Sequence, residues 1–168
     1  MKPYLFEPVK SQAREACYDA TESTEELDRL TNINWCWCGP NKCQVMPSAK
    51  ECLCCWEVKH CDLLRGDSAC ITLHENFEFV ALNKDVLEMS IAQTRTRLGL
   101  TPGDNTRNNS HLRNQAYKNF AHWILRNEVK KLKRIVLPAC VVIAIRNHFP
   151  NSDGKYTRYQ DSTNFSLA

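Results

Sequence analysis

Hydrophobic positions in the second half of the chain recur with the spacing of amphipathic helices. Leu87, Ile91 and Leu98 fall on one face of a segment that Asn83 can open as a cap and Gly99 can end. A helix is therefore predicted between these two residues. Its apolar face is typical of a helix that packs on a core and carries no chemistry.

A second apolar stripe follows the turn-rich segment 101–109. Ser110 is a suitable cap for a helix that runs to about Arg126. Its predicted buried positions are Leu112, Ala116, Phe120, Trp123 and Ile124. Arg113 and Tyr117 share another side, where a cation and an aromatic ring can hold a planar anionic ligand, although a solvated face has the same spacing.

The third apolar segment begins at Ile135. Pro138 suits the first turn of a helix, which we expect through Val141 to about His148, ending before Pro150. A buried strand is the alternative, because β-branched residues are frequent in this segment.

The two ends of the chain lack such periodicity. Residues 1 to about 30 combine Pro, Ser and Thr with acidic residues, so we expect 1–33 to form a mobile arm with one short helix around Thr24 to Leu30. The domain is predicted over 34–159, and 160–168 as a flexible tail. Cys17, alone in the arm, is interpreted as a free thiol.

Composition limits the class of protein without naming a partner. The chain has 168 residues, enough for one compact domain, and a net charge of +3, which is too small to indicate nucleic acid by itself. The first residues lack the apolar run of a signal peptide, and no segment approaches the length of a membrane span. We therefore expect a soluble protein of the cytoplasm.

The cysteines carry the strongest chemical signal. Eight of the ten lie between Trp35 and Cys70. In a reducing compartment such crowding favours metal over disulfides. One zinc ion takes four ligands, so two ions sharing one bridging sulfur need about seven. An iron–sulfur cluster is an alternative user of these thiols.

The spacing arranges these thiols in two turns. The first holds Cys36, Cys38 and Cys43 around a Gly-Pro-Asn turn, and the second holds Cys52, Cys54 and Cys55, followed by Cys61 and Cys70. Adjacent residues such as Cys54 and Cys55 point in different directions, which again suggests two ions. Cys140, at the start of a predicted helix, is either a packing residue or a distant ligand.

Several of these motifs occur together, in one order, in a known family. The strings WCWCGPNKC, CLCC, CIT at 70–72, LPAC at 137–140 and IRNHFPNSDGKY, with Arg113 and Tyr117, resemble the cytoplasmic carboxy-terminal "ballast" domain of the ATP-gated purinergic receptor channels of subtype seven. The resemblance covers about 35–159. It implies an α+β fold, a small mixed helical and β domain with its helices mainly in the second half, around a two-zinc cysteine cluster.

The resemblance also implies site residues. The matching zinc ligands are Cys36, Cys38, Cys43, Cys54, Cys55, Cys70 and Cys140, with Cys38 as the bridge, which leaves Cys52 and Cys61 over. A guanine nucleotide such as GDP is implied at Arg113, Asn114, Tyr117, Ile135, Leu137, Val142 and Asn151. The family has histidine, arginine and lysine where this chain has Asn114, Val142 and Asn151, so charges that hold a diphosphate are missing.

These observations favour a free-standing zinc-binding regulatory or interaction module, with a guanine nucleotide or a protein as its partner. The alternative is a zinc-stabilised nucleic-acid binder that uses the basic run 126–134. Catalysis is not expected, because the sequence contains no Gly-rich phosphate loop and no histidine–glutamate signature of zinc hydrolases.

Overall fold

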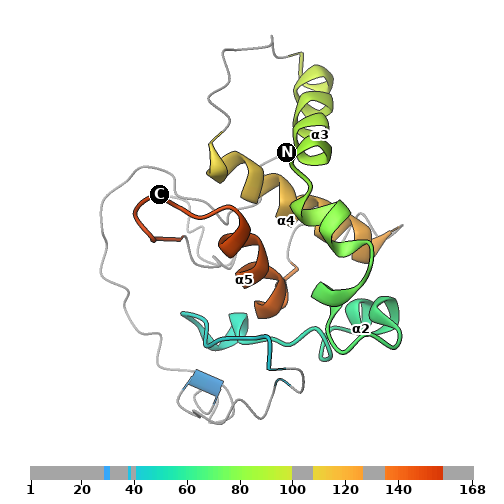
Figure 1. Cartoon of the computed structure of the whole chain (residues 1–168), viewed down its shortest axis with the longest axis vertical. Coiled ribbons are helices and arrows are strands. Elements are labelled where there is room, and N and C mark those ends of the chain that lie inside the picture. The colour runs from blue at the N-terminus through green and yellow to red at the C-terminus, as the bar shows by residue number, and fades with distance from the viewer. Residues whose placement is uncertain (1–28, 31–37, 39–40, 100–107, 127–134, 157–168) are drawn as a thin grey trace, which may run out of the picture.

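The computed structural model describes residues 29–30, 38, 41–99, 108–126 and 135–156. Their regular structure consists of helices, which are arranged in space as Figure 1 shows. In chain order these are η1 (Ala49–Glu51), α2 (Lys59–Arg65), η2 (Ile71–Leu73), the π-helix η3 (Glu78–Leu82), α3 (Lys84–Arg97), α4 (Asn109–Leu125) and α5 (Ala139–His148).

The predicted α+β class is wrong for this part of the chain, which contains helices and turns but no strand. The cysteine segment, which comprises residue 38 and residues 41–73, folds through short turns on either side of η1 and α2. Hydrogen bonds from Asn41 N to Cys38 O and from Leu73 N to Cys70 O close two of these turns. These turns satisfy backbone groups locally while they bring side chains inward. An extended pair of strands is not needed to gather the thiols.

The central element is α4, which contacts α2, η3, α3 and α5. Leu112, Ala116, Phe120 and Ile124 are buried as predicted, and Trp123 is partly buried. The Phe120 ring meets the Phe77 ring edge-on, with 6.0 Å between centroids. The apolar stripe of this helix therefore forms the middle of the core.

Arg113 and Tyr117 do not form the solvent-exposed face that their spacing also allowed. A solvated face was the simpler interpretation of their spacing, yet both side chains are fully buried. Arg113 Nη1 donates to the Phe149 carbonyl at 2.6 Å, which satisfies the charge inside the protein.

The predicted helix ends agree closely with the structure. Asn83 caps α3 by accepting from Val86 N at 3.1 Å. Asn108, rather than Ser110, caps α4 by accepting from His111 N at 3.1 Å. An asparagine two residues earlier performs the same role because its side chain reaches the first free amide groups equally well.

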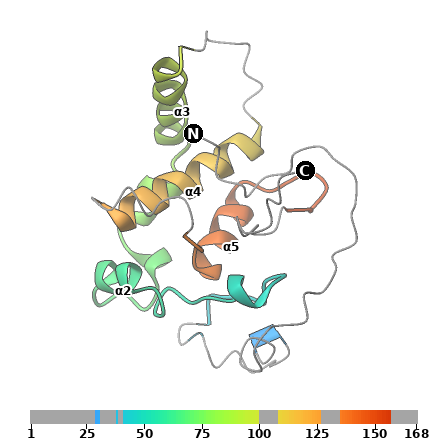
Figure 2. The same ribbon diagram turned by 180° about the vertical axis from the view of Figure 1, so that it is seen from behind.

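The segment after Pro138 forms helix α5, as predicted, and not the buried strand that was the alternative. Pro138 precedes it with φ of −56°, and most of its first two turns are buried. Ala139 N donates to Leu53 O at 2.8 Å, so the start of α5 lies against the cysteine segment, as both views show (Figures 1 and 2).

Several predictions fall partly or wholly outside the described residues. Of the predicted arm, residues 29 and 30 are described, and both are helical. Arg29 bonds to Glu57 at 2.6 Å and to Cys52 O at 2.9 Å. Most of the basic run, Cys17, Cys36 and the tail from 157 lie outside the described ranges. Across those ranges, no helix combines the length and apolar character that crossing a bilayer requires.

Candidate metal centre

Six cysteines form two compact groups of three. We define the first triad as Cys38, Cys43 and Cys54, and the second triad as Cys55, Cys70 and Cys140. Within each triad the sulfur atoms lie within 4.8 Å of one another. All six side chains are buried, and the thiols are free rather than paired in disulfides.

The first triad is assembled by a tight turn. Asn41 takes a positive φ of 53°, a conformation that asparagine tolerates better than most residues, and its N–H bonds to Cys38 O at 3.1 Å. The chain thereby reverses, and Cys43 N donates to the Cys38 sulfur at 3.4 Å. Burial raises the pKa of the Cys38 thiol, and this amide partly opposes that effect because it stabilises the thiolate form.

The neighbours Cys54 and Cys55 belong to different triads. The backbone turns at this point, with Glu57 N bonded to Cys54 O at 3.0 Å. The Glu57 carboxylate accepts from Cys54 N at 2.8 Å and bonds to Arg29 on its other side. This turn lets two consecutive residues direct their sulfurs to two separate centres.

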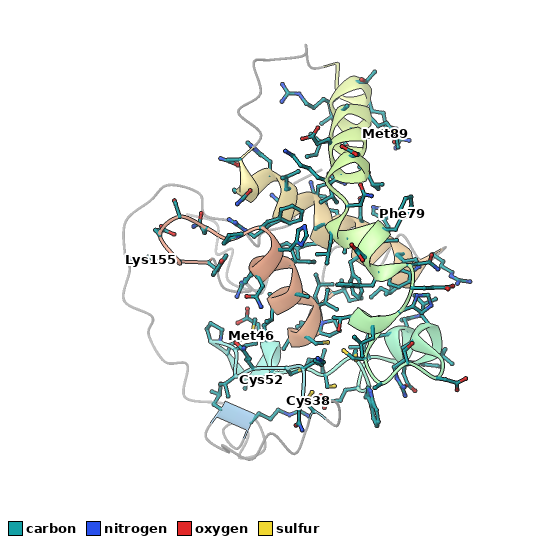
Figure 3. All side chains as sticks on the ribbon, in the orientation of Figure 1. Cys38, Met46, Cys52, Phe79, Met89 and Lys155 are labelled. Atoms are coloured by element: carbon teal, nitrogen blue, oxygen red, sulfur yellow. The ribbon has the colours of Figure 1, made fainter. Side chains whose placement is uncertain are left out.

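The second triad combines residues that are distant in the sequence. Cys70 precedes η2, and its sulfur accepts from Thr72 Oγ1 at 3.1 Å and lies 3.8 Å from the Cys55 sulfur. Cys140 comes from the first turn of α5, next to the Ala139–Leu53 bond. Figure 3 shows the labelled Cys38 in the cysteine segment beside the start of this helix.

Cys140 joins the two triads. A hydrogen bond with Cys140 is the largest influence on Cys43, and it lowers the pKa of that thiol to about 7. A hydrogen bond with Cys140 likewise lowers the pKa of Cys70 to about 2. The pKa of Cys140 itself is raised, first by its hydrogen bond with Cys43. Cys140 therefore connects the first triad to the second through Cys43 and Cys70.

This donor set fits a metal chemically. Buried thiolates need compensating positive charge, which a cation supplies. Sulfur ligands in groups of three or four suit zinc or an iron–sulfur cluster, whereas calcium and magnesium require oxygen. Six of the seven predicted ligands are brought together, and Cys36, the seventh, lies outside the described residues.

The two remaining described cysteines lie outside both triads. The Cys52 sulfur accepts from Met46 N at 3.3 Å, and Figure 3 labels both residues. Cys61 is fully buried in α2, where burial raises the pKa of its thiol. Both are buried side chains.

The residues predicted for a nucleotide do not line one common pocket. Four of them, Arg113, Tyr117, Leu137 and Val142, have fully buried side chains. Asn151 Nδ2 donates to Asp153 at 2.5 Å and to Lys155 O at 2.8 Å. Ile135 is half-buried, and Asn114 lines a separate pocket between α3 and α4.

The sequence did not predict the side chains that lie beside Arg113. Its guanidinium lies over the Tyr156 ring, 5.2 Å from the centroid, and Arg146 lies over the same ring at 4.6 Å. No periodic signal marks Tyr156, because it follows the last helix in an irregular segment. Its pairing with two arginines depends on how 149–156 folds back.

Comparison with known proteins places the chain in a family. The family described as the P2X purinoreceptor 7 intracellular domain matches residues 5–160. The chain is 29% identical to the P2X purinoceptor 7 of Mus musculus and 28% identical to that of Rattus norvegicus, in each case over 130 residues and 76% of this chain. It spans about a fifth of the length of these relatives, since the matches cover 20% of each. This chain therefore belongs to the family of the P2X purinoreceptor 7 intracellular domain.

Proposed function

We propose that the chain is an intracellular regulatory module whose fold is stabilised by two structural zinc ions. The observation that carries the proposal is the pair of adjoining, fully buried cysteine triads. Membership of a family of intracellular domains supports the location and the regulatory role.

Zinc suits these residues for three reasons. The donors are sulfur atoms, the ligand count approaches two four-coordinate sites, and zinc imposes no geometry beyond a tetrahedron. The first triad with Cys36 would hold one ion and the second triad the other, with Cys38 as the shared ligand that the family resemblance implies. Sites closed by four thiolates leave no position for water, so the metal has a structural role and no catalytic one.

Such ions would contribute most of the local stability. Binding of a structural zinc ion contributes roughly 10–16 kcal/mol to folding at neutral pH. The segment 41–58 contains one three-residue 3₁₀-helix and otherwise turns. Without metal, its turns have too few hydrogen bonds to offset their loss of backbone entropy.

A guanine nucleotide at the α5 side of α4 is a further prediction of the resemblance. In the folded chain, Arg113 is bonded to Phe149 O and covered by Tyr156. A base or phosphate at Arg113 therefore requires 149–156 to move away. This requirement distinguishes nucleotide binding here from binding to a preformed pocket.

Metal content tests the proposal. Elemental analysis of the purified chain should give two zinc ions per molecule, and Cys43→Ser and Cys70→Ser should each lower that number. Cys52→Ser is the matched control and should retain both ions. One ion or none in the unaltered chain, or visible absorption from iron, would refute the assignment.

The same sample tests the alternatives. Mass spectrometry of material released on denaturation should detect a guanine nucleotide if the nucleotide prediction is right. Salt-dependent binding to DNA or RNA that Lys130→Ala, Lys131→Ala and Lys133→Ala together abolish would instead favour the nucleic-acid binder.

A further inference from the structure

A small basic pocket lies between α3 and α4, which pack against each other. Its volume is about 130 Å³. Ile91 and Arg95 line it from α3, and His111, Gln115 and Lys118 line it from α4. A water molecule occupies about 30 Å³ and drug-sized ligands need pockets of about 300 Å³ or more, so this pocket suits one small polar group.

The pocket lies on a different side of α4 from Arg113 and Tyr117, although Asn114, another predicted nucleotide contact, lines it. Positions 111, 114, 115 and 118 follow the spacing of a single helix face, whereas Arg113 and Tyr117 point to the opposite side. Arg113 bonds to Phe149, beyond the end of α5. The pocket is thus separate from the zinc cluster and from Arg113 and Tyr117, and it shares only Asn114 with the predicted nucleotide contacts.

The charges around the pocket have one sign. Arg95, His111 and Lys118 are among its lining residues, and no lining residue is acidic. His111 lies in the first turn of α4, where the positive end of the helix dipole adds to this charge. An anion in this pocket meets basic side chains from both helices and no lining carboxylate.

Lys118 gives independent support. Its side chain is half-buried, and the described part of the chain offers its ammonium group no acceptor or ion-pair partner. Burial lowers the pKa of this lysine, because desolvation disfavours the charged ammonium. A partly desolvated ammonium without a counterion is unfavourable until an anion supplies the missing partner.

We propose that the pocket between α3 and α4 is a binding site for a single phosphate group, held by Lys118 and Arg95. Arginine offers paired donors that match two phosphate oxygens, and lysine supplies a compact charge. His111, in the first turn of α4, also lines the pocket. The phosphate belongs either to a free phosphate compound or to the headgroup of an anionic lipid.

Inorganic phosphate is the first probe. Titration of the zinc-loaded chain, followed by calorimetry and by ³¹P NMR, should show saturable binding of one phosphate that weakens with added salt. Lys118→Gln and Arg95→Gln should each weaken that binding at least tenfold. Lys59→Gln, which removes an exposed lysine from α2, is the matched control and should bind as the unaltered chain does.

Vesicles separate the two sources of phosphate. Binding to phosphatidylcholine vesicles that contain phosphatidic acid, lost in Lys118→Gln and absent with phosphatidylcholine alone, assigns the site to a lipid headgroup. Saturable phosphate binding without vesicle binding assigns it to a free phosphate compound. If neither probe binds, or if Lys118→Gln and Lys59→Gln bind alike, the proposal is wrong; circular dichroism and zinc content confirm that each variant is folded.

Discussion

Replacing Cys140 with serine should reveal whether one metal ion links α5 to the cysteine segment. Cys140 lies 70 residues beyond Cys70 in the sequence, and the two sulfurs belong to the same triad. A cross-link that closes a loop of this size lowers the entropy of the unfolded chain by the equivalent of about 4 kcal/mol. Loss of this link should therefore lower the free energy of unfolding by about that amount.

The substitution also places a hydroxyl where a buried thiol was, which by itself costs about 1–3 kcal/mol. Cys61→Ser measures this second effect, because Cys61 is equally buried and helical but belongs to neither triad. The difference between the two variants isolates the cross-link. At roughly 2–4 °C per kcal/mol, a difference of about 4 kcal/mol corresponds to roughly 8–16 °C in melting temperature.

Urea unfolding followed by tryptophan fluorescence provides the assay, since Trp56 and Trp123 lie on the cysteine segment and on α4. Zinc content should fall in Cys140→Ser and stay unchanged in Cys61→Ser. A chelator should abolish the difference between the variants. Equal destabilisation of both variants in the presence of bound zinc would refute the cross-link and, with it, the metal assignment for the second triad.

Three further predictions concern the helices and the buried thiols. Arg113→Met should lower the free energy of unfolding by about 1.5–3 kcal/mol, which is the contribution of a hydrogen bond from a charged group. Hydrogen exchange should also become faster at the backbone amides of 149–156. Unchanged exchange in this segment would contradict the role of Arg113. Asn83→Ala and Asn108→Ala should each cost about 1 kcal/mol in thermal unfolding, while Ser110→Ala, beside the cap of α4, should cost less than Asn108→Ala. Burial raises the pKa of the Cys61 thiol above the ordinary value of 9.0, so the contribution of this thiol to stability is complete below pH 9 and declines as the pH rises further. Between pH 8 and pH 10, the free energy of unfolding in urea should therefore decline less for Cys61→Val than for the unaltered chain. An identical decline in both proteins would contradict this role of Cys61.

Helices α3, α4 and α5 were predictable because each has a local signal, whereas α2 (Lys59–Arg65) was not predicted. Asn83 and Gly99 bound α3, and the spacing of Leu112, Ala116 and Phe120 reports the buried stripe of α4. Such signals depend on neighbours three or four residues away, so one sequence contains them in full.

The features that were not predicted depend on contacts between residues that are far apart in the sequence. Arg113 is buried because Phe149 and Tyr156 fold back onto it, and no sequence pattern within α4 predicts these two contacts. The α+β expectation came from family resemblance, whereas the described cysteine segment folds by turns that centre on its sulfurs. Lys118 and Arg95 gave no signal either, because their shared pocket exists only once α3 and α4 pack together.

The position of Cys140 has a consequence for synthesis. A ribosome adds roughly 5–20 residues per second, so Cys140 is made roughly 4–14 s after Cys70. During that interval the nascent chain carries reactive thiols whose final partner has not yet been translated. Oxidants or competing metals in the cell thus have a short period in which to capture them, and the speed of elongation between the two codons becomes a determinant of the yield of correctly assembled protein.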